Sequence, residues 1–215
     1  MILPIRLYGD PILRRQTAPV KRFDAELKRL VDDMIETVYA ADGIGLAAPQ
    51  VGVPLSIFVA LEAARDESDD AAEDHEASEE DETQAPQTRD QKRRAWGVIR
   101  EHVMINPRIT ERRGQQHGRD GCLSLPGLVV EDVPRDLAVR VEYLDVNGEP
   151  QVLTAEGYFA HVIQHEYDHL RGVLFFDHLS EDVRRAFLES NRAELSSMQR
   201  EAKERLKAKP AGRTG

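Results

Sequence analysis

The chain has 215 residues, a length that favours one domain, 1–215, with a sizeable core over two full domains. Its net charge is −10, so it is poorly suited to holding nucleic acid through its overall field, and we expect no DNA partner. No run approaches the roughly 18 apolar residues that span a bilayer, and the N-terminus lacks a leader, so we expect a cytoplasmic protein without membrane contact.

The N-terminal part predicts a helix, a loop and a strand. Apolar residues recur at three-and-four spacing over 25–41, which is typical of an amphipathic helix packed on the core. A glycine-punctuated loop follows at 43–50, and the β-rich run 55–61 predicts a strand.

An acidic insert separates this strand from the rest of the chain. Twelve acidic residues lie among alanines and serines between Glu62 and Glu82, opposed only by Arg65, and a basic patch at 89–94 closes the segment. Such composition predicts a solvated, disordered linker over 62–95, although the basic patch could fold back on the acids. Because loop-closure entropy grows slowly with length, the insert need not disturb the domain.

The second half predicts further strands and two helices. Strand-like segments lie at 98–109, 137–144 and 151–154, and the last two are joined by an Asn-Gly turn typical of an antiparallel hairpin. A mostly apolar, buried helix is expected over 156–171. A short strand is predicted at 173–176, and a charged helix at 180–208.

The apolar helix carries a candidate metal site. Its segment 165–169 reads H-E-Y-D-H and matches H-E-x-x-H, which places His165 and His169 one turn apart on the same face, where both can bind one ion. Glu166 can then reach a water molecule as a general base without being a ligand. Two unrelated histidines and a carboxylate would be costly in so apolar a helix.

A third protein ligand is needed, because catalytic sites of this kind usually leave one of four positions open. Cys122 is the natural candidate, in the segment D-G-C-L-S-L-P-G whose glycines and proline predict a tight, strand-breaking loop. Inert core filler is the ordinary role of a lone cysteine. The competing hypothesis is a zinc endopeptidase with a downstream third ligand, for which Asp177, His178 and Glu181 are candidates.

Three segments, taken together and in order, resemble the peptide deformylase family. That family is marked by a G-x-G-x-A-A-x-Q loop, an E-G-C-L-S loop and Q-H-E-x-D-H, which correspond here to 43–50, 120–124 and 164–169. The resemblance runs to about Leu179. It implies an α+β fold in which antiparallel β-sheets pack around a central metal-binding helix, with a C-terminal helix. It also implies hydrolysis of the formyl group from formyl-methionine on nascent polypeptides, with release of formate.

The resemblance assigns roles around the ion. Cys122, His165 and His169 would bind one divalent metal, typically ferrous iron in the family, although zinc and other divalent metals can occupy such a site. Glu166 would take a proton from the attacking water, and the ion would help to stabilise the developing oxyanion.

Further roles concern the substrate. The side-chain amide of Gln50 and the backbone N–H of Leu123 would stabilise the oxyanion together with the metal. Gly43, Ile44 and Gly45 would present backbone groups to the substrate peptide, which adds like an extra strand.

Three positions depart from the pattern or compete with it. Asp120 stands where the family has Glu, and its expected partner is Arg135. The segment 128–132 lacks an arginine that some members use near the substrate backbone. His161 precedes His165 by one turn, but its use as a ligand would leave Glu166 without a role, so a position at the pocket rim or the surface is expected.

A non-enzymatic alternative is a silent homologue that acts as a binding module on the ribosome or on an acidic partner, although intact ligands and Glu166 argue against it. The basic end of the C-terminal helix suggests that residues 193–209 contact ribosomal RNA.

Overall fold

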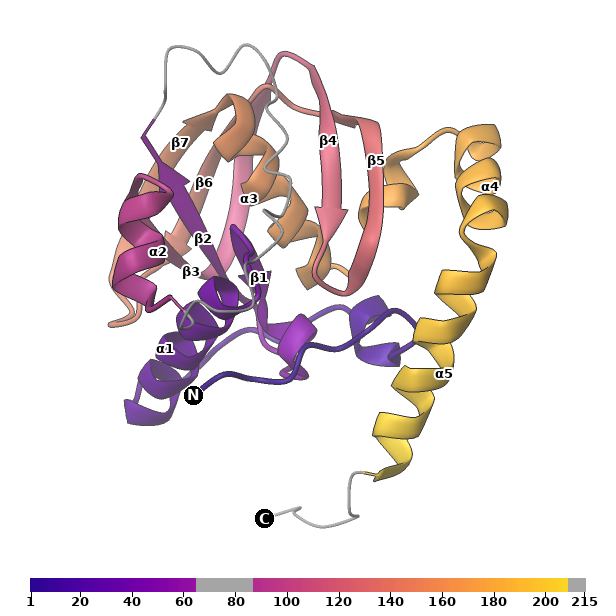
Figure 1. The fold of residues 1–215 in the computed structure, drawn as a ribbon. Helices are drawn as coiled ribbons and strands as arrows, with labels where there is room; N and C mark the ends of the chain where they lie inside the picture. The colour runs from indigo at the N-terminus through magenta and orange to yellow at the C-terminus, as the bar shows by residue number, and fades with distance from the viewer. Residues whose placement is uncertain (65–86, 209–215) are drawn as a thin grey trace.

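The computed structural model describes residues 1–64 and 87–208 (Figure 1). Its α-helices are α1 (Ala25–Ala40), α2 (Arg89–Ala95), α3 (Gly157–Leu170), α4 (Glu181–Ser190) and α5 (Arg192–Ala208). Its strands are β1 (Gly45–Ala47), β2 (Ile57–Ala63), β3 (Val98–Arg113), β4 (Gln116–Cys122), β5 (Leu125–Arg135), β6 (Ala138–Leu144) and β7 (Pro150–Glu156). Short 3-10 turns lie at η1 (Pro11–Arg14), η2 (Ala48–Val51) and η3 (Phe175–His178).

Two antiparallel sheets lie on either side of helix α3. The larger has the order β1-β2-β3-β6-β7, and the smaller is the β4-β5 hairpin. Figure 1 shows α3 between them, and it contacts strands of both sheets. The α+β fold with antiparallel sheets around a central helix is therefore confirmed.

Helix α1 confirms the prediction for 25–41 almost to the residue. Asp24 caps its start by accepting hydrogen bonds from the backbone N–H groups of Glu26 and Leu27, each at 3.1 Å. Its apolar face is buried in a cluster shared with β1 and β2 and is formed by Leu27, Val31, Met34, Ile35, Val38 and Tyr39. This packing fixes the chain immediately before the 43–50 segment.

The 43–50 segment is more regular than a loop. Its middle is strand β1, which pairs antiparallel with β2 in the register Leu46↔Val59, and its end is the turn η2. The strand expected at 55–61 is β2, displaced by two residues.

The boundaries expected for the acidic insert are wrong at both ends. Strand β2 continues through Ala63, and the basic patch forms helix α2, which begins with Thr88 and Gln91 in a reciprocal capping arrangement. The remaining prediction, disorder over 65–86, lies outside the described residues.

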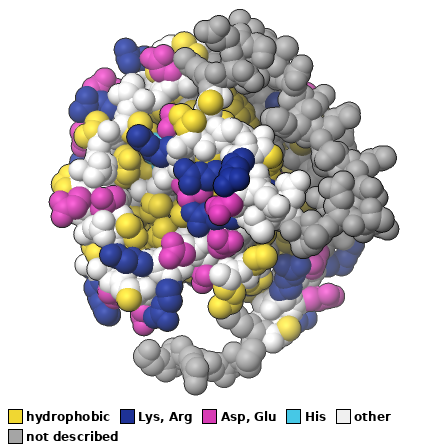
Figure 2. Space-filling model, turned by 60° about the vertical axis from the view of Figure 1, so that its left-hand side comes forward, with side chains coloured by type: hydrophobic (Ala, Val, Ile, Leu, Met, Phe, Trp, Pro, Cys, Tyr) yellow, Lys and Arg dark blue, Asp and Glu magenta, His cyan; other side chains and the backbone are white. Residues whose placement is uncertain are grey.

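Helix α2 folds back on acidic side chains of α1, of the segment after α1 and of β3. Arg89 pairs with Glu101 and Glu36, and Lys92 pairs with Asp42. On the face seen in Figure 2, Lys and Arg side chains are interspersed with Asp and Glu. These ion pairs explain why a patch expected to stay hydrated is ordered on the core.

The strands predicted at 98–109, 137–144 and 151–154 are β3, β6 and β7, and Gly148 (φ +84°) closes the predicted hairpin turn. Strands β4 and β5 were not predicted. The segment expected to be a strand-breaking loop at 120–127 instead contains the end of β4, a tight turn and the start of β5.

Two predictions for the C-terminal part are wrong. Residues 173–176, expected to be a strand, form none: the last two begin the 3-10 turn η3. The helix expected over 180–208 is two helices, α4 and α5. They separate at Asn191, whose side-chain amide donates to the Phe187 carbonyl at 2.8 Å and so competes with a continuous helix. No described helix is long and apolar enough to cross a membrane.

Candidate metal centre

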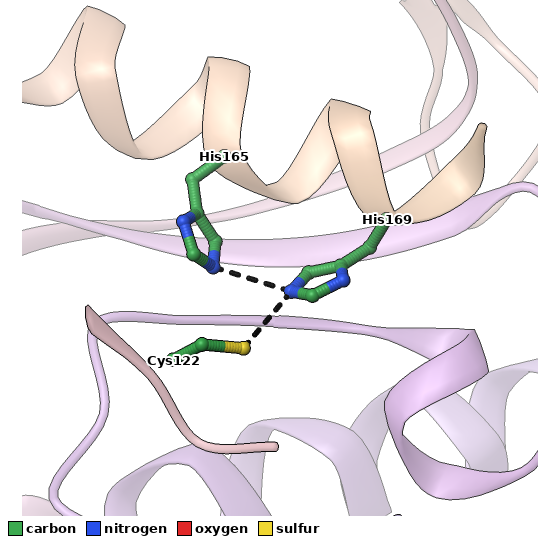
Figure 3. Close-up of side chains that lie close together, drawn as sticks. All are labelled: Cys122, His165 and His169. Atoms are coloured by element: carbon green, nitrogen blue, oxygen red, sulfur yellow. Dashed lines mark hydrogen bonds between the residues drawn. The ribbon is translucent and has the colours of Figure 1, made fainter. Parts of the chain in front are cut away.

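Helix α3 and the β4-β5 hairpin bring three potential ligand atoms together (Figure 3). The Nε2 atoms of His165 and His169 lie 3.2 Å apart, and Cys122 Sγ lies 3.3 Å from His169 Nε2. All three donor atoms lie within 4.8 Å of one another, and all three residues are buried. The two histidines lie close together because they are one helical turn apart on α3, and the cysteine is placed beside them by the end of β4.

The electrostatic surroundings of Cys122 favour its thiolate form. Burial would raise the pKa of the thiol, but His169 and His165 beside it lower that pKa to about 5. A buried thiolate facing two imidazole nitrogens is a suitable donor set for iron or zinc. The residues present therefore fit a divalent ion of this class.

Glu166 lies beside this group but offers it no ligand atom. Its carboxyl group is buried, and the Oε2 atom has no hydrogen-bond partner among the described residues. Burial raises its pKa to about 7. A Cβ atom at Gly45 would lie 2.3 Å from Glu166 Oε1, so only glycine leaves the carboxyl group its place. A base with this pKa can accept and return a proton near neutral pH.

Gln50 reaches the centre from η2. Its Oε1 accepts from the backbone N–H of Ala47 at 2.7 Å, which directs Nε2 towards Cys122 Sγ at 3.5 Å and Ser124 Oγ at 3.4 Å. The amide therefore has a fixed orientation beside the metal-binding group.

The remaining predicted residues lie around the same group. Leu123 is in the turn after Cys122, and its Cδ1 would be 2.8 Å from a Cβ at Gly43. Gly43 and Gly45 are buried, whereas Ile44 is 38% exposed. The structure thus brings the loop before β1 and the cysteine turn into contact.

A buried polar network supports the histidines. Asp120 Oδ1 lies 2.6 Å from His165 Nδ1, and Oδ2 accepts from Arg135 at 2.8 Å, so the expected Asp120–Arg135 pair is confirmed. Burial raises the pKa of Asp120, but His165, His161 and Arg135 hold it well below its ordinary range. The contact with Nδ1 leaves Nε2 of His165 to face the other ligands.

Sequence reasoning missed the other side of this network. Asp168, inside the H-E-x-x-H segment, accepts from Arg135 and lies 2.6 Å from His178 Nε2. Its position in the Q-H-E-x-D-H pattern was the available signal. His178 therefore belongs to this network, and the metal-binding group found among residues 1–64 and 87–208 includes neither His178 nor Asp177 nor Glu181. His161, expected at a rim or the surface, is buried and also stays outside that group.

Comparison with known proteins gives one consistent result. The family model described as Polypeptide deformylase matches residues 2–185. A peptide deformylase of Thermus thermophilus is 48% identical over 207 residues, covering 96% of this chain and 97% of the relative. One of Desulfotalea psychrophila is 41% identical over 179 residues, covering 83% and 88%.

Solved structures agree with this result. The crystal structure of peptide deformylase from Thermus thermophilus has a TM-score of 0.76 and 46% identity, covering 94% of this chain and 99% of that one. The chain therefore belongs to the peptide deformylase family, whose hydrolases remove the N-terminal formyl group from nascent polypeptides.

Proposed function

We propose that this chain removes the formyl group from formyl-methionine of nascent polypeptides with the help of one divalent ion, held by Cys122, His165 and His169. Ferrous iron is the proposed resident metal, and zinc is the alternative. The observation that carries the proposal is the convergence of one sulfur and two Nε2 atoms in a buried group. When bound, the ion supplies a Lewis acid that polarises the formyl carbonyl and makes water more acidic.

Glu166 moves the protons of the reaction. Its carboxylate takes a proton from the water that attacks the formyl carbon, and it returns the proton to the amine nitrogen when the C–N bond breaks. The products are formate and a free N-terminal amine. The pKa of about 7 and the unpartnered Oε2 atom support this role, because the group can change protonation state without breaking another hydrogen bond among the described residues.

Gln50 and Leu123 stabilise the oxyanion that forms on the formyl oxygen. The Gln50 amide is held by Ala47, and the backbone N–H of Leu123 lies in the turn directly after the cysteine ligand. Fixed donors need no reorganisation when charge develops, which is the basis of their contribution.

The substrate backbone binds along Gly43, Ile44 and Gly45. Strand β1, which begins at Gly45, is the edge strand of the larger sheet, and a peptide can add to such an edge through main-chain hydrogen bonds. Leu123 packs at Gly43, which places this edge beside the proposed oxyanion donors.

Residues 1–215 act as a single domain in the cytoplasm, where nascent chains are made. The contacts of α3 with both sheets support the single domain. The exposed basic residues Lys203, Arg205 and Lys207 support contact of α5 with the ribosome, while Lys209 lies outside the described residues. Unchanged ribosome cosedimentation of a Lys203→Glu/Lys207→Glu variant would contradict this partner.

The central test measures formate release from a formyl-methionyl peptide, with iron or zinc loaded under anaerobic conditions. Glu166→Gln is expected to lower kcat at least about 100-fold, because proton transfer is lost, while metal content stays at one ion per chain. Glu156→Gln is the matched control, since this exposed residue directly precedes the same helix and its side chain makes no capping hydrogen bond. Equal rates in the parent and Glu166→Gln would contradict the proposed mechanism.

A further inference from the structure

His161 occupies a position that the proposed mechanism does not use. It lies in α3 one turn before His165, is 4% exposed, and places Nε2 3.1 Å from Asp120 Oδ2. We propose that His161 is a positioning residue that anchors Asp120, so that Asp120 in turn fixes the metal ligand His165. The inference rests on the proposed metal site and goes beyond it, because it concerns a residue that binds neither metal nor substrate.

The two oxygens of the Asp120 carboxylate contact different partners. Its Oδ1 atom contacts Nδ1 of His165 at 2.6 Å, which sets the ring so that Nε2 faces His169 and Cys122. Its Oδ2 atom accepts a hydrogen bond from Arg135 at 2.8 Å, and His161 Nε2, which has no hydrogen-bond partner among the described residues, lies 3.1 Å from the same oxygen. Residues that orient a metal-ligating histidine typically change metal affinity when they are removed.

The short side chain of Asp120 leaves little freedom in how its two oxygens reach their partners. The family motif carries Glu at this position, and Asp120 is shorter by one methylene group. Arg135 comes from β5 and is also paired with Asp168, so its charge is divided between two carboxylates. His161 and His165 lie four residues apart on the same face of α3, so a contact with His161 holds Oδ2 against the face where Oδ1 must meet His165.

The imidazole ring of His161 fits closely between strand β4 and its own helix, α3. A Cβ atom at Gly118 in β4 would lie 3.1 Å from His161 Nδ1, so the absence of a side chain there lets the ring approach the strand. The Tyr158 ring lies on the same helix with its centroid 6.2 Å away. The ring is thus limited by β4 and by its own helix, with Nε2 directed at Asp120.

The experiment compares His161→Leu, His161→Gln and the control His117→Leu with the parent. His117 Nδ1 also lies near an aspartate, 2.8 Å from Asp132 Oδ1, but on the exposed surface of the β4-β5 hairpin that carries Asp120. The readouts are the Kd for Co²⁺, measured by competition with a chelator, the absorption spectrum of bound Co²⁺, and the Tm of the metal-free protein. These report the ligand geometry without requiring activity.

We expect His161→Leu to weaken Co²⁺ binding about 10- to 100-fold and to change the spectrum. His161→Gln, which keeps a donor, should recover most of the affinity, and His117→Leu should match the parent. In an Asp120→Glu background, whose longer side chain reaches further, the loss caused by His161→Leu should be smaller.

Parental affinity in His161→Leu would overturn the inference, as would equal losses in the Leu and Gln variants that follow the Tm of the metal-free protein. Failure of the parent itself to bind Co²⁺ would instead overturn the proposed metal site.

Discussion

At the scale of single residues, the surroundings of Glu166 and Cys122 shift the pKa values of these two groups in opposite directions. Burial raises the pKa of Glu166 to about 7, whereas His169 and His165 overcome the burial of Cys122 and lower its pKa to about 5. Near neutral pH the sulfur is therefore an anion ready to bind a metal, while the carboxyl group is poised between its two forms. Opposite shifts of this kind distinguish a ligand from a proton carrier.

This difference predicts a pH-dependent stability for the metal-free protein. The pKa of Glu166 is higher in the folded state than its ordinary value of 4.5, so folding favours its protonated form, and the resulting stability is lost as the pH rises from about 4.5 to about 7. Gln cannot ionise. Relative to the parent, Glu166→Gln should therefore gain up to about 3 kcal/mol between pH 4.5 and pH 7.5.

The measurement is urea unfolding of both metal-free proteins across that pH range. Cys122 titrates in both proteins, so the part of its contribution that does not depend on Glu166 cancels in the difference. The Cys122 thiolate also raises the pKa of Glu166, and that coupled part belongs to the predicted difference. A difference that does not change with pH would show that Glu166 is not held as a buried, protonated group.

The residues that sequence reasoning identified share one property: each lies in a short motif. His165, Glu166 and His169 are one helical turn, and the Cys122 loop is contiguous. Asp168 and His161 were not assigned their contacts, because their partners on β4, β5 and η3 are distant in the chain. Local spacing predicts ligands, but only the tertiary fold identifies what orients them.

At the scale of elements, the same limit explains the missed hairpin. Strand β4 reads Q-H-G-R-D-G-C, and its two buried residues are Asp120 and Cys122, so it shows no alternation of apolar and polar residues. Its register with β5 shifts between Gly118 and Asp120 and again between Gly121 and Cys122. Periodicity predicts strands that pack through apolar faces, as β2 and β6 do. Strand β4 has no such face, and the buried apolar residues of β5, Leu125, Leu128 and Val133, are unevenly spaced.

The strand predicted at 173–176 is wrong for a different reason. Short buried runs occur in strands and helical turns alike, and the composition alone does not separate them. Phe175 and Phe176 lie in η3 and pack edge-to-face with each other, and both contact the ring of Phe187 in α4. The tertiary contacts with α4 therefore decide the conformation of this segment.

Helix α5 is predicted to contribute to the stability of the fold in addition to any role on the ribosome. Met198 is 7% exposed and packs in the cluster that includes Leu7 and Phe176. Met198→Ala should lower the free energy of unfolding by about 2 kcal/mol or more, because a buried side chain is removed. Leu206→Ala on the same helix, where the side chain is 41% exposed, should change it by less than about 0.5 kcal/mol.

Urea unfolding at equilibrium measures both variants of α5. Equal small effects would indicate that Met198 does not anchor α5 to the fold.

At the scale of the whole molecule, one arginine connects the parts that form the site. Arg135 ends β5, pairs with Asp120 on β4 and Asp168 on α3, and is almost completely buried together with them. Asp168 in turn contacts His178 at the end of η3. Both sheets also contact α3. The network therefore holds the smaller sheet against the helix that carries the two histidine ligands.

Arg135→Met is predicted to be strongly destabilising. It leaves two buried carboxylates without their cation, a change that typically costs about 3 to 5 kcal/mol. Arg140→Met is the control, because its pair with Glu111 is largely exposed and should contribute less than about 1 kcal/mol.

Arg135 helps hold the pKa values of Asp120 and Asp168 below their ordinary range. The loss of stability in Arg135→Met should therefore shrink as acid protonates both carboxylates. Urea unfolding of the metal-free variants at pH 7 and at lower pH measures both effects. A loss no larger than that of Arg140→Met would mean that Arg135 does not help to hold the smaller sheet against α3.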